Sequence, residues 1–129
     1  MDHVAILRKS KISKGDNLLQ DILEGRKTVE SRWYVNKVSP WNKIKSGDVV
    51  YFKESGGPVT VRASVEKVIQ YEDLNEITIK NIISKYGKYI APHTTPDDFL
   101  LWGHKQNKKR YCILIFLKNA VKIEPFDID

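Results

Sequence analysis

Charged residues are concentrated in the segment Gly25–Trp33, GRKTVESRW. A lysine that is partly desolvated beside an arginine has a lowered pKa, so Lys27 is a candidate base. Glu30 can accept a hydrogen bond from a base amino group or a ribose hydroxyl, and Arg32 can donate two parallel hydrogen bonds to a phosphate or carboxylate. These residue types form a coherent binding pocket without catalysis. An enzyme would also need a nucleophile or an activated water, and Thr28 is the only nearby hydroxyl that shares the strand face of Glu30.

The elements on either side of this segment follow from the apolar periodicity. Residues Asp16–Glu24 (DNLLQDILE) predict a short helix with an apolar stripe, capped by Asp16 and ended by Gly25, which has no Cβ to clash at positive φ. From Thr28 the period changes to two, which predicts a strand. One strand face then carries Thr28, Glu30 and Arg32. The simplest alternative to a functional site is a Glu30–Arg32 ion pair on a half-exposed strand.

A family resemblance favours the functional interpretation. Gly25, Lys27, Glu30 and Arg32 have the spacing G-x-K-x-x-E-x-R, which resembles the signature of the ASCH family, a small branch of the PUA-like superfamily. The likeness covers roughly the first 75 residues. It also includes Trp41, a strand opening at Gly47–Phe52 and a long strand at Val59–Tyr71.

The resemblance implies a β-barrel whose cleft is lined by Lys27, Thr28, Glu30 and Arg32 and binds RNA or a nucleotide-like ligand. Some family members resemble small amidohydrolases that act on acylated cytidine, with the motif lysine, a threonine three positions later and a further glutamate. Here Glu30 stands at the threonine position, and no further glutamate can be placed. The alternative to a binding module is therefore a small hydrolase, of acylated cytidine or of RNA, that uses Lys27 as base with Glu30 or Thr28 as partner.

Basic and aromatic residues outside the motif extend the expected binding surface. Aromatic rings can stack on bases, and Trp41 is the better candidate because Trp33 has the parity of the apolar strand face; packing in the core is the alternative for Trp41. Two basic runs are candidate backbone contacts or, alternatively, solvated loops. They contain Lys9, Lys11 and Lys14, and Lys108, Lys109 and Arg110.

Composition limits the remaining possibilities. The chain has 129 residues, a net charge of +6 and a pI of about 9.4, which suits one domain over residues 1–129 and an anionic partner. Cys112 is the single cysteine, and the three histidines are scattered, so we expect no disulfide within the chain, no metal and no cofactor. No segment is apolar enough for a membrane helix, which favours the cytoplasm. The identity of the ligand and the oligomeric state are not determined by the sequence.

The rest of the chain predicts an α+β fold. We expect a PUA-like, mostly antiparallel β-barrel of five to six strands with about three flanking helices. A first strand lies within Met1–Leu7, a hairpin turn spans residues 55–58, and a bulge lies near Lys67. Helices begin near Asn75 and at the Thr95 cap, and end at Gly87 and Gly103. A strand at Tyr111–Leu117, a turn at Asn119–Ala120 and a last strand at Val121–Glu124 complete the chain.

Overall fold

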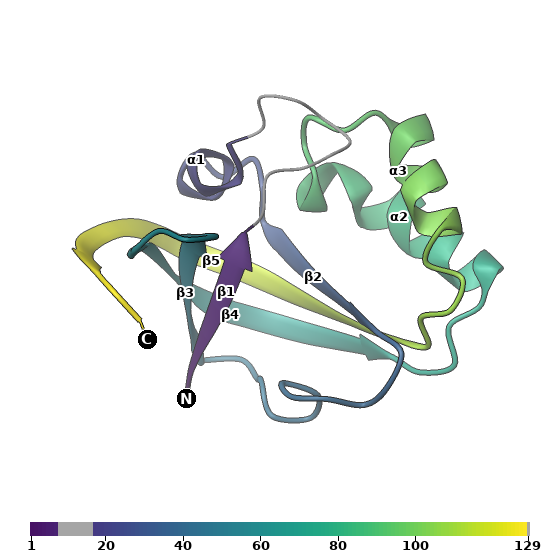
Figure 1. Cartoon of the computed structure of the whole chain (residues 1–129), viewed down its shortest axis with the longest axis horizontal. Helices are drawn as coiled ribbons and strands as arrows, with labels where there is room; N and C mark the ends of the chain where they lie inside the picture. Colours follow the sequence, from purple (N-terminus) through teal and green to yellow (C-terminus); the bar gives the residue numbers. More distant parts are fainter. Residues whose placement is uncertain (8–16, 129) are drawn as a thin grey trace.

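The computed structural model describes residues 1–7 and 17–128, and it contains one five-stranded sheet and three helices (Figure 1). The strands are β1 (Asp2–Leu7), β2 (Val29–Tyr34), β3 (Val49–Glu54), β4 (Val59–Tyr71) and β5 (Tyr111–Phe126). The helices are α1 (Leu18–Leu23), α2 (Glu76–Ile90) and α3 (Pro96–His104). Figure 1 shows α2 and α3 together over one end of the sheet, with α1 apart from them.

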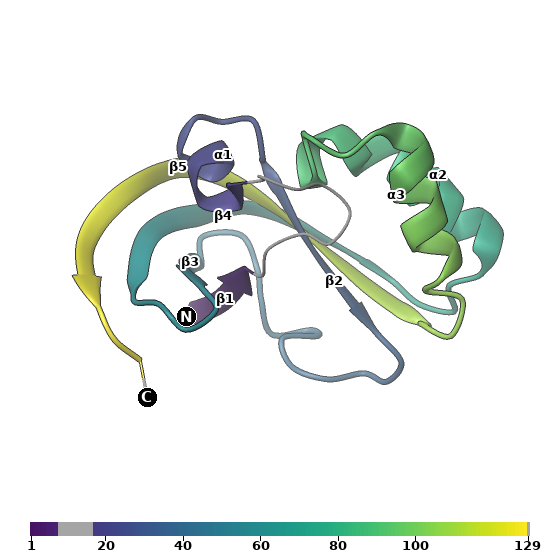
Figure 2. The same ribbon diagram turned by 45° about the horizontal axis from the view of Figure 1, so that its top comes forward.

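The sheet is mixed and open rather than a closed, mostly antiparallel barrel. Its strand order is β1-β3-β4-β5-β2, with β1 parallel to β3 and the other neighbours antiparallel. Figure 2 shows that β4 and β5 are strongly curved. This curvature folds the sheet over itself, but β1 and β2 remain its two edges within the described residues. The α+β class is confirmed, whereas the expected barrel closure is not.

The two faces of the sheet carry two hydrophobic clusters. On β4, Val61, Ala63 and Val65 are buried inside the curve, as their alternation predicts. On β5, Ile113 and Ile115 belong to the same inner cluster. The intervening Cys112 and Leu114 face the other way and pack with residues of α2 and α3. Since β5 is covered on both sides, its first half is a continuous apolar run.

The helix before the charged segment forms largely as predicted. Asn17, rather than Asp16, is its N-cap, because the Asn17 side chain accepts the Gln20 N–H; Asp16 lies outside the described residues. Gly25 follows the helix with φ of +77°, in the left-handed region where a glycine is favoured.

Gly87 and Gly103 do not end their helices. Helix α2 continues to Ile90, and α3 continues to His104. A Cβ on Gly103 would lie 2.3 Å from Ile83 Cδ1, and a Cβ on Gly87 would lie 3.4 Å from the Phe99 ring. Both glycines are therefore contact positions where α2 and α3 approach each other. The Thr95 cap of α3 is confirmed, since its side chain accepts the Asp98 N–H.

The last two predicted strands are one strand. Asn119 has φ of +53°, but β5 continues through it to Phe126. Opposite Arg62–Ser64 of β4, β5 contributes the longer segment Lys118–Val121, so the predicted turn is a bulge inside a paired strand. The bulge predicted near Lys67 is confirmed by a register shift between Val65 and Lys67.

Candidate functional site

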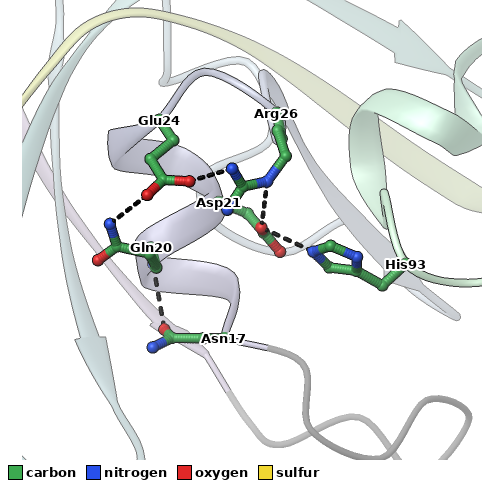
Figure 3. Close-up of polar contacts among 6 residues, drawn as sticks. All are labelled: Asn17, Gln20, Asp21, Glu24, Arg26 and His93. Carbon is green, nitrogen blue, oxygen red and sulfur yellow. Dashed lines mark hydrogen bonds and ion pairs between the residues drawn. The ribbon is translucent and has the colours of Figure 1, made fainter.

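The motif begins at a turn that is held by Asp21 of α1. The Asp21 backbone carbonyl accepts the N–H groups of Arg26 and Lys27 at 2.9 and 3.0 Å. Its carboxylate Oδ1 pairs with Arg26 Nε and His93 Nε2, both at 2.9 Å (Figure 3). Asp21 is only 1% exposed, and its Oδ2 has no hydrogen-bond partner within the described residues. This carboxylate connects α1, the motif turn and the loop between α2 and α3.

The sequence did not point to Asp21, or to a contact between Asp21 and His93. The available signal for Asp21 was a carboxylate inside an otherwise apolar helix, where it must find cations or donors once the helix is buried. No local pattern could indicate the contact of His93 with Asp21, because it joins residues far apart in the chain.

Lys27 is a buried residue of the motif. It is 3% exposed, and its Nζ donates to the carbonyls of Val29 at 2.9 Å and Ile90 at 2.7 Å. Burial lowers the pKa of Lys27, and the nearby carboxylate of Glu30, with its Oε1 3.6 Å from Nζ, opposes this effect. The predicted lowering of the Lys27 pKa is therefore confirmed, with burial as its main cause. The ammonium group ties the start of β2 to the end of α2.

Glu30 pairs with Lys27 rather than with Arg32. Glu30 is 8% exposed, and its Oε1 also accepts the Ser31 N–H at 3.2 Å. No Glu30–Arg32 ion pair exists within the described part of the chain, so the alternative of an ordinary pair on a half-exposed strand is wrong. Glu30 and Lys27 form a buried pair next to the sheet, and neither lines the cavity described next.

Arg32 extends into a cavity of about 230 Å³ between the two edge strands. Its guanidinium makes no hydrogen bond or ion pair with any other described residue. Tyr34 also lines the cavity, and on β2 it has the same parity as Arg32, so the alternation could have predicted it. The other lining residues come from β1, the loop after β2, β3 and β5: His3, Val4, Ala5, Ser39, Pro40, Ile44, Val50 and Ile115.

His3 lines this cavity, and its ring is hydrogen-bonded to a buried carboxylate. Its Nε2 lies 2.9 Å from Asp48 Oδ2, and Asp48 itself is 3% exposed. The hydrogen bond from His3 lowers the pKa of Asp48 to about 2, and the Lys45 N–H at 3.1 Å acts in the same direction. The sequence did not point to His3, because only the parallel pairing of β1 with β3 brings it beside Asp48.

The other predicted site residues lie in different surroundings. Thr28 is half-buried and joins two elements through its backbone, since its N–H donates to Tyr89 and its carbonyl accepts from Leu117. Trp41 is 8% exposed and packs edge-to-face on Tyr111, with ring centroids 5.3 Å apart. Its ring is therefore part of the core, which corresponds to the packing alternative.

Only one of the two basic runs can be placed. Arg110 donates its backbone N–H to the Tyr34 carbonyl at 2.9 Å, so the run that includes Lys108 and Lys109 meets the end of β2 near the cavity. Lys9, Lys11 and Lys14 lie outside the described residues. Among the described residues, no group of histidine, cysteine or carboxylate side chains is arranged to hold a metal ion. No described helix is both long and apolar enough to cross a membrane.

Comparisons with known proteins identify the fold. No protein-family model and no curated protein sequence matches the chain. Among solved structures, the ASCH protein of Zymomonas mobilis superposes with a TM-score of 0.62 at 15% identity, covering 97% of this chain and 72% of that one. A tyrosine-to-phenylalanine mutant of the Zymomonas mobilis protein gives a TM-score of 0.64, also at 15% identity, over 97% and 74% of the two chains. The ASCH resemblance is thus confirmed at the level of the fold.

Proposed function

We propose that this chain, which has the fold of the ASCH domains, binds RNA or a nucleotide in the cavity between β1 and β2. The observation that carries the proposal is the Arg32 guanidinium, which lines the cavity without a partner among the described residues. A guanidinium donates in a planar fork that matches the oxygens of a phosphate. Since apolar side chains such as Val50 and Ile115 line the same cavity, it suits a ligand with one anionic and one apolar part.

The size of the cavity limits the part of the ligand that enters it. Its volume of about 230 Å³ lies below the roughly 300–1,000 Å³ of pockets that hold drug-sized ligands. We infer that one nucleotide unit enters, and that the rest of an RNA chain lies outside. We propose that the basic run at Lys108 and Lys109 contacts phosphates there, and the backbone bond from Arg110 to Tyr34, which lines the cavity, supports this role.

The motif residues then divide into two roles. Arg32 contacts the ligand. Lys27 and Glu30 instead fix β2 in place through their buried ion pair, and Lys27 does so also through its hydrogen bonds to the carbonyls of Val29 and Ile90. Fixing the backbone of β2 also fixes the position from which the Arg32 side chain extends. A preorganised side chain loses less entropy when a ligand binds. Thr28 belongs to the supporting set, through its backbone bonds to Tyr89 and Leu117.

Catalysis by Lys27 is not part of this proposal. Its Nζ is almost fully buried and already donates to two carbonyls, so it would have to leave both to reach a ligand. Incubation with RNA and with N-acetylcytidine, followed by mass spectrometry, tests this assignment. Products that form with the wild type and vanish with Lys27→Ala, in a variant whose circular dichroism is unchanged, would replace the binding module with a hydrolase.

Binding is tested by fluorescence anisotropy with a labelled pool of single-stranded RNA and by calorimetry with ribonucleotides, both at low salt. We expect Arg32→Ala to weaken binding by roughly tenfold or more, because it removes a charge-assisted hydrogen-bond pair. Arg62→Ala is the matched control, since Arg62 is exposed on β4 and does not line the cavity. Absence of binding to every RNA and ribonucleotide would overturn the proposal.

A further inference from the structure

His3 offers the cavity a second, proton-dependent charge. Its side chain is 14% exposed and lines the cavity, whereas Asp48, which holds Nε2, does not line it. No described residue hydrogen-bonds to His3 Nδ1.

The contact with Asp48 sets the state of the imidazole. Asp48 accepts hydrogen bonds from the Lys45 N–H at 3.1 Å and from the Met1 ammonium group at 3.2 Å, and both favour its charged form. It is thus an ionised carboxylate, which can only accept. His3 Nε2 must then carry the proton, and in the neutral ring Nδ1 holds a lone pair that can take up a second proton.

The charged groups around His3 can be assigned to two sides. On the Asp48 side, the carboxylate pairs with Nε2 of the ring and with the Met1 ammonium group, while Lys45 contributes only its backbone N–H. Arg32 and Tyr34 of β2 line the cavity with His3. The cavity therefore has one permanent cation, Arg32, and a second one when His3 is protonated.

Two cations match a terminal phosphate better than an internal phosphodiester. A phosphomonoester carries a charge of about −1.5 to −2 at neutral pH, whereas a diester carries about −1. An imidazolium placed between the Asp48 carboxylate and a bound phosphate would be stabilised by both anions.

We propose, on the basis of the nucleotide-binding function above, that the cavity selects a nucleotide with a terminal phosphate, held between Arg32 and His3. On binding, His3 Nδ1 takes up a proton from solvent and donates it in a hydrogen bond to a phosphate oxygen.

Calorimetry with defined probes tests the selectivity. Each ribonucleoside 5′-monophosphate is compared with its nucleoside and with the corresponding dinucleoside monophosphate, which has only an internal diester. We expect the 5′-monophosphate to bind roughly tenfold more tightly than the diester, through the additional charge-assisted hydrogen bond. Equal affinities would overturn the inference and leave nucleotide binding intact. No binding by any of these probes would also overturn the inference, whereas the RNA titrations described above decide the proposed function.

Proton uptake distinguishes the role of His3 from a structural one. Titrations in buffers of different ionisation enthalpy should show net proton uptake when the 5′-monophosphate binds. In His3→Gln, whose amide can still donate to Asp48, we expect this uptake to disappear and the preference for the monoester to be lost. His104→Gln on α3 is the control, since His104 is 66% exposed and lies outside the cavity. Uptake that persists in His3→Gln would assign the proton to the phosphate and overturn the inference.

Discussion

Lys27 shows how a charged motif residue can act through the backbone rather than through a ligand. Its ammonium group satisfies two carbonyls from different elements, Val29 of β2 and Ile90 of α2, and lies 3.6 Å from the Glu30 carboxylate. A buried ion pair of this kind adds little to stability compared with apolar packing, but breaking it leaves the remaining partner buried and unpaired.

Lys27→Met should therefore destabilise the protein strongly. The substitution keeps the length of the side chain but leaves the Glu30 carboxylate without its cation and the Ile90 carbonyl without a donor, at a cost of about 3 kcal/mol. Chemical denaturation measures the change. Adding Glu30→Gln to the same chain should recover part of the loss, because it removes the unpaired charge. Lys88→Met, at an exposed position of α2, should change the free energy of unfolding by less than about 0.5 kcal/mol.

The low pKa of Asp48 in the folded protein predicts that this carboxylate contributes to acid unfolding. Its pKa is about 2 in the folded protein and 3.8 ordinarily. Because the folded value is the lower one, the stabilisation is complete above about pH 4 and is lost as the pH falls toward about 2. Asp48→Asn should lower the free energy of unfolding at neutral pH and flatten its pH dependence between these limits. Denaturant titrations across this range test the expectation, and an unchanged slope would show that other carboxylates dominate acid unfolding.

At the scale of elements, the contact between α2 and α3 depends on glycine. The two helices meet where Gly103 of α3 faces Ile83 and Ile79 of α2. A methyl group on Gly103 would lie 2.3 Å from Ile83 Cδ1 and 3.2 Å from Ile79 Cγ2, well inside normal contact distances. Exchange for alanine favours an isolated helix by about 1 kcal/mol, so packing and helix propensity oppose each other here.

We expect packing to win in Gly103→Ala, with a net loss of about 1 kcal/mol, because overpacking a core costs roughly 1–3 kcal/mol. Ile83→Val removes the clashing Cδ1, so the alanine should cost less in that background. Thermal or chemical denaturation of the double-mutant cycle measures the coupling. A Gly103→Ala protein more stable than the wild type would show that Ile83 can move aside without loss of packing.

The sequence predicted elements whose pattern is local and missed features that depend on a neighbour. The alternation in β4, the Thr95 cap and Gly25 all follow from the chain within a few residues of each position. By contrast, Gly87 and Gly103 have the composition of helix stops, and only the partner helix shows why glycine is needed there. Asn119 likewise has the composition of a turn, but β4 is long enough to keep pairing beyond it.

The candidate site was predictable to a similar extent. The alternation placed Glu30 and Arg32 on one strand face. It could not show that Lys27 would pair with Glu30 and leave Arg32 without a partner in the part of the chain that the structure describes. His3 and Arg32 line the same cavity although they lie on β1 and β2, the two edge strands of the curved sheet. The cavity is therefore a product of the tertiary fold, and no spacing in the sequence reveals it.

At the scale of the whole molecule, basic side chains occur on several described elements. The net charge is +6, from 22 basic and 16 acidic residues, and basic side chains lie on β5 and on α2. A general attraction between the protein and RNA would involve all of these side chains about equally. The proposed site instead assigns phosphate contacts to the run beside Tyr34.

The salt dependence of RNA binding separates these two cases. Each phosphate contact to a single strand contributes about 0.7 to the slope of log K against log salt concentration. Replacing both Lys108 and Lys109 by glutamine should therefore reduce the magnitude of the slope by about 1.4, whereas Lys118→Gln with Lys122→Gln, at exposed positions on the far half of β5, should leave it nearly unchanged. Anisotropy titrations across a range of salt concentrations give the slopes. Equal reductions in both double variants would mean that RNA is held by the overall charge of the protein, because only a localised contact makes the position of the lysines matter.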